Sequence, residues 1–99
     1  MDIKVERDEE RTTVYLSGSI DIPGAEKLKQ SLNQILKEKA EEVAIDFEEV
    51  TFIGSSGIGK LLLFYKNFTS IGCKVKIINL NSELKALFKT IKLDKLFNL

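Results

Sequence analysis

A run of glycine and serine residues near the middle of the chain has the residue types and spacing that could handle a phosphate. Residues 50–61 read VTFIGSSGIGKL: a short apolar run, then glycines and serines, then a helical pattern. At the start of a helix, free backbone N–H groups and the positive end of the helix dipole attract anions. The segment either binds the phosphate of a nucleotide or carries a phosphate on one of its own serines.

The nucleotide interpretation depends on the pattern G-x-x-x-x-G-K, which residues 54–60 satisfy from Gly54 to Lys60. In such a loop, backbone N–H groups surround the phosphates and the lysine contacts their outer oxygens. The pattern also requires Ser or Thr at the next position to ligate Mg²⁺, but this chain has Leu61 there. Leu61 suits a core position of the following helix, so nucleotide binding is kept only as an alternative.

The two serines of the segment, Ser55 and Ser56, are the candidate phosphate acceptors. We expect one of them to be the N-cap of the following helix, with its hydroxyl at the surface. Gly57 and Gly59 leave the first turn bare, although glycine in a helix interior costs about 0.8–1.0 kcal/mol relative to alanine. A phosphate would add about −1.5 to −2 charges. The residues alone leave two possibilities open, a phosphoacceptor or a tight glycine-rich turn with a serine cap.

Composition excludes most common enzyme chemistries. The chain has no histidine, so Ser-His-Asp and Cys-His catalysis and histidine-ligated metal sites are excluded. Its one cysteine, Cys73, borders a strand-like run and is interpreted as a small buried hydrophobe. These exclusions remove most of the common hydrolase mechanisms.

Length and charge limit the partners. The 99 residues predict a single domain over residues 1–99, and the 15 basic and 15 acidic residues cancel. No net field attracts nucleic acid or an anionic membrane, so we expect neither as a partner. No segment resembles a signal peptide or has the length of a membrane span, which predicts a cytoplasmic protein.

Hydrophobic spacing predicts three helices. Apolar residues recur at three- and four-residue steps over residues 23–39, with Pro23 in the first turn. A second helix is expected from residue 55 to about residue 70, and a third begins at a cap formed by Asn81 or Ser82. The expected inner stripe of the second helix consists of Ile58, Leu61, Leu62, Tyr65 and Phe68.

Four short segments read as strands. Alternating apolar and polar residues at 3–6 and 13–17, on either side of a charged turn, predict a hairpin. The apolar runs at 43–47 and 73–78 predict two further strands, each reached through a helix and therefore parallel to its neighbour. The predicted class is α/β, in the order β-β-α-β-α-β-α, with a small mixed sheet and helices mainly on one face.

Several stretches, in the correct order, carry a resemblance to a known family. Gly18-Ser19-Ile20-Asp21 is similar to a G-x-[LI]-D motif before a first helix, and residues 43–50 resemble the third strand and the following turn. Residues 52–59, FIGSSGIG, are similar to the signature D-S-[ST]-G-[LI]-G, and residues 87–88 and 92–97 resemble the family's ending. The chain is thereby identified as a member of the STAS domain family, resembling its single-domain bacterial anti-sigma factor antagonists.

The resemblance implies a STAS-like fold and a regulatory protein that is controlled by exchange of partners and is not an enzyme. The expected antagonist has no catalytic residue, no metal and no cofactor, because the nucleotide belongs to the kinase. The unmodified antagonist binds an anti-sigma factor that is also an ATP-dependent serine kinase, which frees the sigma factor for transcription. The kinase phosphorylates the first serine of the signature and the complex dissociates; a metal-dependent serine phosphatase restores the antagonist. On this pattern the acceptor is Ser55, with Ser56 as the alternate. Asp21, Gly54 and Gly57 lie with both serines on the docking surface.

One position departs from the family pattern. The signature begins with Asp, and this chain has Gly54 there. We expect the missing carboxylate to change how a kinase recognises or orients the acceptor. The alternative function is therefore a constitutive STAS interaction or scaffold module in a signalling or transport assembly.

Overall fold

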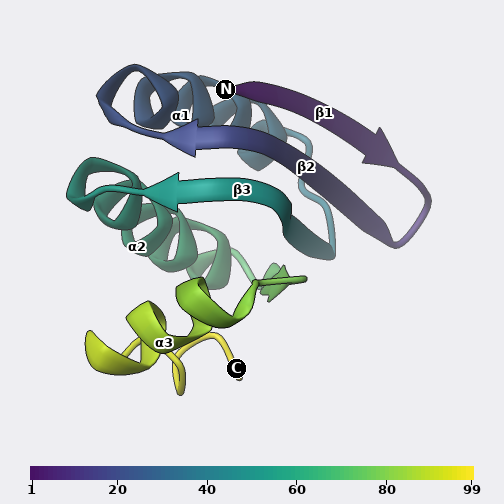
Figure 1. The fold of residues 1–99 in the computed structure, drawn as a ribbon. Coiled ribbons are helices and arrows are strands. Elements are labelled where there is room, and N and C mark those ends of the chain that lie inside the picture. The colour runs from purple at the N-terminus through teal and green to yellow at the C-terminus, as the bar shows by residue number, and fades with distance from the viewer.

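The computed structural model describes all 99 residues and contains one four-stranded sheet in the order β1-β2-β3-β4. β1 (Asp2–Arg7) pairs antiparallel with β2 (Arg11–Ile20). β3 (Glu42–Ile53) runs parallel to β2, and β4 (Lys74–Ile78) runs parallel to β3. The small mixed sheet expected from the hydrophobic pattern is confirmed (Figure 1).

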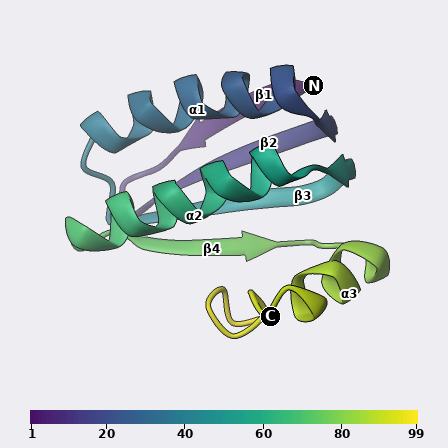
Figure 2. The ribbon, with the colours of Figure 1, turned by 90° about the vertical axis from the view of Figure 1, so that its left-hand side faces the viewer.

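Three helices complete the predicted order β-β-α-β-α-β-α. α1 (Ile22–Lys37) and α2 (Ser55–Ser70) lie side by side over one face of the sheet, whereas α3 (Ser82–Thr90) lies beyond β4 (Figure 2). The side chain of Asn81 accepts a hydrogen bond from the backbone N–H of Leu84, so Asn81 is the N-cap of α3. None of the helices combines the length and the hydropathy that a membrane-spanning segment needs.

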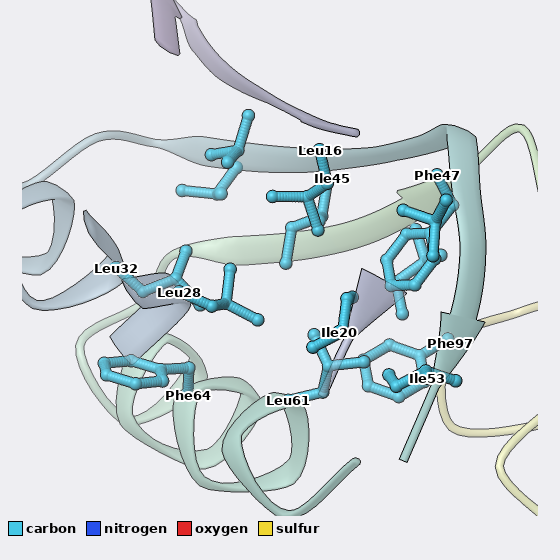
Figure 3. Close-up of a cluster of buried hydrophobic side chains, with 14 of the residues drawn as sticks. Leu16, Ile20, Leu28, Leu32, Ile45, Phe47, Ile53, Leu61, Phe64 and Phe97 are labelled. Carbon is cyan, nitrogen blue, oxygen red and sulfur yellow. The ribbon is translucent and has the colours of Figure 1, made fainter. Parts of the chain in front are cut away.

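The core lies between the sheet and the two covering helices (Figure 3). Alternate residues of β2 point towards the helices and are buried, whereas Tyr15 on the opposite face is exposed. α1 contributes the apolar stripe expected from its spacing. The buried side chains labelled in Figure 3 include Leu16, Ile20, Leu28, Leu32, Ile45, Ile53, Leu61 and Phe64.

The two central strands are longer than predicted. The sequence pattern ended them at residues 17 and 47, but they continue to Ile20 and Ile53. The extra residues remain paired through two register shifts, and Gly18 adopts a positive φ of 99° between them. Glycine takes this conformation without steric cost, so it allows an irregularity inside a strand that the sequence pattern ended one residue earlier.

The buried stripe of α2 differs from the prediction at two positions. Leu62 is 38% exposed, whereas Phe64, which the pattern left outside the stripe, is buried. The helix faces the sheet through Gly57, so positions four, seven and eleven residues later become buried. A glycine carries no hydrophobic signal, and the sequence pattern therefore did not show where the stripe begins.

The only cysteine, Cys73, is 3% exposed within the hydrophobic core, as its interpretation as a small hydrophobe required. Burial raises the pKa of the Cys73 thiol, and the carboxylate of Glu42 raises it further. A raised thiol pKa means less thiolate at a given pH, and the thiolate is the reactive form.

We expect Cys73 in the folded protein to react with a disulfide reagent much more slowly than free cysteine at mildly alkaline pH. The measurement is the rate at which the reagent's thiol is released, before and after addition of denaturant, with free cysteine as reference. Equal rates in the folded and unfolded states would contradict the buried, thiol-form assignment.

Candidate functional site

The candidate site lies where β2 and β3 end and α1 and α2 begin. Because the two strands are parallel, both strand-to-helix junctions lie at the same edge of the sheet (Figure 2). One residue forms each junction: Asp21 between β2 and α1, and Gly54 between β3 and α2. The backbone N–H of Gly54 donates to the carbonyl of Ile20 over 3.0 Å, which fixes one junction against the other.

Residues from both junctions line one shallow hollow of about 220 Å³. The hollow brings together four of the five residues that the sequence assigned to the docking surface, Asp21, Gly54, Ser55 and Ser56. Gly57, the fifth, is buried beneath it and takes part only through the backbone position that it allows. The hollow is also lined by Ile22 and Phe52.

Asp21 has a structural role at the start of α1. It is the N-cap of the helix, and its Oδ1 accepts a hydrogen bond of 2.8 Å from the backbone N–H of Gly24. A methyl group on Gly24 would lie 2.8 Å from the Ser19 carbonyl oxygen and 3.0 Å from that same Oδ1. Glycine at position 24 leaves room for this hydrogen bond, which holds the exposed Asp21 carboxylate beside the hollow.

The expectation that Ser55 or Ser56 caps α2 is wrong. The N-cap is Gly54, in extended conformation, and no side chain caps the helix. Ser55 is the first helical residue and is exposed, whereas Ser56 is partly buried. Because the turn between β3 and α2 is only one residue long, the serines already lie inside the helix. The Ser55 hydroxyl is therefore not used to hold the helix end.

The first turn of α2 offers donors and no acidic side chain. Its first intrahelical hydrogen bond runs from the N–H of Ile58 to the carbonyl of Gly54, over 3.1 Å. The N–H groups of the three preceding residues have no acceptor within the helix, as at any helix start. Together with the helix dipole, they make the surroundings of Ser55 favourable to a negative charge.

Gly57 and Gly59 have opposite surroundings in the same helix. A methyl group on Gly57 would lie 2.6 Å from Cγ2 of Ile20 and 2.9 Å from Cγ1 of Ile53, too close for any residue but glycine. A methyl group on Gly59 would meet nothing within 4 Å. Gly57 is thus needed for packing, whereas nothing within the fold requires glycine at position 59.

The geometry does not suit a nucleotide-binding loop. Such a loop needs several residues between strand and helix to surround the phosphates, and here Gly54 alone separates β3 from α2. Leu61, at the position where the pattern needs a Mg²⁺-ligating hydroxyl, is 2% exposed in the core. No group of three or more His, Cys, Asp or Glu side chains is arranged to hold a metal ion.

The sequence interpretation missed two residues of the site. Ile22 is 75% exposed and Phe52 is 52% exposed, and both line the hollow beside Ser55. The available signal was an isoleucine between Asp21 and Pro23, and an aromatic residue two positions before Gly54. Phe52 was assigned to the family signature and Ile22 to no motif, and neither residue was assigned a surface role.

The family model described as STAS domain matches residues 2–99, so the chain belongs to the STAS domain family. It is 24% identical over 94 residues to the anti-sigma-B factor antagonist of Listeria monocytogenes serovar 1/2a, covering 95% of this chain and 82% of that protein.

Two solved structures have the same fold. An anti-sigma factor antagonist from Mycobacterium paratuberculosis superposes with a TM-score of 0.87 at 24% identity, covering 97% of this chain and 81% of that one. The Bacillus cell fate determinant SpoIIAA, in its phosphorylated form, superposes with a TM-score of 0.77 at 18% identity, covering 95% and 86% respectively. The predicted STAS-like fold is confirmed.

The two glycines of α2 provide a matched pair of substitutions. We expect Gly57→Ala to lower the free energy of unfolding by about 1–3 kcal/mol, because the methyl group overpacks the junction. Gly59→Ala should raise it by about 0.8–1.0 kcal/mol, because alanine is the better helix former and has room. Urea denaturation measures both, and effects of the same sign would contradict the packing described for Gly57.

We further expect calorimetric titration with MgATP to give no binding heat, because no loop surrounds the phosphates. Lys60→Ala is the control, and it should give the same blank trace. A saturable heat that disappears in Lys60→Ala would restore nucleotide binding as a function of this segment.

Proposed function

We propose that this protein is an anti-sigma factor antagonist switched by phosphorylation of Ser55. Its unphosphorylated form binds an anti-sigma factor that is also a serine kinase, which frees the sigma factor. Phosphorylation of Ser55 ends the complex, and a serine phosphatase restores the binding form. The observation that carries the proposal is that Ser55 is exposed and its hydroxyl does not cap the helix. It lines a hollow shared by both strand-to-helix junctions.

The direction of the switch follows from electrostatics. A phosphate on Ser55 would carry about −1.5 to −2 charges at the positive end of α2, where the isolated domain tolerates it. In a complex, the same group would be removed from water against a partner surface, and an unpaired desolvated charge is costly. Phosphorylation should therefore leave the fold intact and weaken the complex. SpoIIAA, which shares the fold, has been solved in phosphorylated and unphosphorylated forms.

Ser55 is the better of the two candidate acceptors. It is exposed, whereas Ser56 is partly buried, so a kinase can reach the Ser55 hydroxyl without moving the helix. We propose Asp21, Gly54 and Ser56 as the surrounding docking surface because they line the same hollow. Gly57 serves this surface by positioning α2.

The protein acts by binding in this proposal and is not an enzyme. ATP belongs to the kinase, so the antagonist needs no cofactor or metal of its own, and it works in the cytoplasm where sigma factors act. The residue Gly54 favours one alternative, a constitutive STAS scaffold in a signalling or transport assembly, because the carboxylate of the family signature is absent beside the acceptor.

The test is incubation with ATP and the anti-sigma kinase encoded in the same genome, followed by intact-mass measurement and site mapping. We expect one phosphate, on Ser55. Ser55→Ala should take up none and remain in the complex. Ser55→Asp should weaken binding about tenfold or more, which corresponds to about 1.4 kcal/mol of unfavourable charge burial.

Ser82 provides the matched control, because it is an exposed first residue of a helix, like Ser55, but belongs to α3. Ser82→Ala and Ser82→Asp should bind and accept phosphate as the wild type does. A phosphate on Ser56 would reassign the acceptor, and Ser55→Asp binding as tightly as wild type would contradict the charge mechanism. A stable complex that is never phosphorylated would favour the scaffold.

A further inference from the structure

Two of the exposed large apolar side chains stand on the same hollow as Ser55. Ile22, at the start of α1, is 75% exposed, and Phe52, near the end of β3, is 52% exposed. Isolated exposed hydrophobic residues are common on soluble proteins. These two come from different elements and line one hollow with the acceptor serine, which sets them apart from a scattered surface residue.

The local structure restrains the backbone around Ile22 and positions the ring of Phe52. Ile22 is the first residue of α1, between the N-cap Asp21 and Pro23, whose ring fixes the backbone φ there. The Phe52 ring lies against Gly54: a methyl group there would be 3.4 Å and 3.6 Å from ring atoms Cε2 and Cζ. The ring of Phe52 thus lies beside Gly54, on the side from which a side chain at position 54 would project.

The absence of a side chain at position 54 determines the character of the hollow. With Gly54, the aromatic ring of Phe52 forms a wall next to Ser55. Asp21 is the only acidic residue that lines the hollow, and its Oδ1 already accepts the Gly24 N–H. A carboxylate at position 54 would make the same place acidic, whereas this chain presents an apolar one.

We propose that the hollow receives an apolar side chain of the serine kinase, with Ile22 and Phe52 as the two anchors that determine partner specificity. This inference rests on the proposed function, since any kinase acting on Ser55 must cover the hollow that contains it. At about 220 Å³, the hollow is smaller than the roughly 300–1,000 Å³ typical of small-molecule sites. Its size and its apolar walls therefore suit a protruding side chain better than a metabolite.

The anchors also explain why a phosphate on Ser55 releases the partner. The phosphate enters the hollow that holds the partner's side chain, so the two compete for one space. A charged group between apolar walls loses hydration without gaining a cationic partner. Ile22 and Phe52 therefore strengthen the preference of the kinase for the unphosphorylated form.

Calorimetric titration of the anti-sigma kinase from the same genome tests this directly. Ile22→Ala and Phe52→Ala should each weaken binding about tenfold or more, as expected when a buried apolar anchor is truncated. Their melting temperatures should stay close to that of wild type, because both side chains are exposed. Ile71→Ala is the matched control: Ile71 is 54% exposed at the far end of α2, and binding should be unchanged.

Gly54→Asp separates specificity from stability. Aspartate is a good N-cap, so the variant should melt at a higher temperature than wild type. It also places a carboxylate against the Phe52 ring and into the hollow, so the kinase should bind it more weakly, although the change restores the family signature. Kinase binding as tight as wild type by Gly54→Asp would overturn the apolar assignment.

The remaining outcomes are also decisive. If wild type binds the kinase and both alanine variants bind equally well, the anchor inference fails while the proposed function stands. If wild type forms no complex at all, the proposed function fails and takes the inference with it. A homodimer in gel filtration that Phe52→Ala dissociates would overturn the choice of occupant, because the hollow would then hold a second copy of this chain.

Discussion

The close approach of α2 to the ends of β2 and β3 is the constraint on which the rest of the site depends. Gly57 allows it, because any larger residue would collide with Ile20 and Ile53. With the helix in this position, the Gly54 N–H reaches the carbonyl of Ile20 and joins the two junctions. The packing of Gly57 determines which residues of α2 are buried and which side of its first turn faces solvent. The position of Ser55 follows from packing underneath it.

Several features of the same site lower the stability of the isolated domain and leave a surface open for a partner. Gly59 has room for a side chain and lies in a helix, where alanine would be more favourable. The acceptor serine caps nothing, and two apolar side chains beside it remain in water. Each feature is unfavourable for the isolated chain, and together they leave a bare, partly apolar surface at a helix start. Proteins commonly retain such costs where a site must bind another molecule.

Much of the fold could be predicted from the sequence because periodicity reports burial directly. The order of elements, the mixed sheet and the apolar stripe of α1 all follow from two- and 3.6-residue repeats. Two of the errors lie where glycine interrupts these repeats: at Gly18, which continues a strand, and at Gly57, which begins a buried stripe. Asp46 illustrates a different gap. This buried residue accepts hydrogen bonds from the Glu48 N–H and from the side chain of Asn79, more than thirty residues away, and no local pattern indicates the second pairing.

For the candidate site, the sequence by itself determined which residues are available: two serines before a helix, glycines around them, no histidine for catalysis, and Leu61 in place of a metal-ligating hydroxyl. Only the tertiary structure decided that Gly54 is the cap, that Ser55 is the exposed serine, and that Ile22 and Phe52 stand beside it. The physical reason is that residue types and spacing act along the chain. Which side chains share one hollow depends on how two junctions, more than thirty residues apart, are packed against each other.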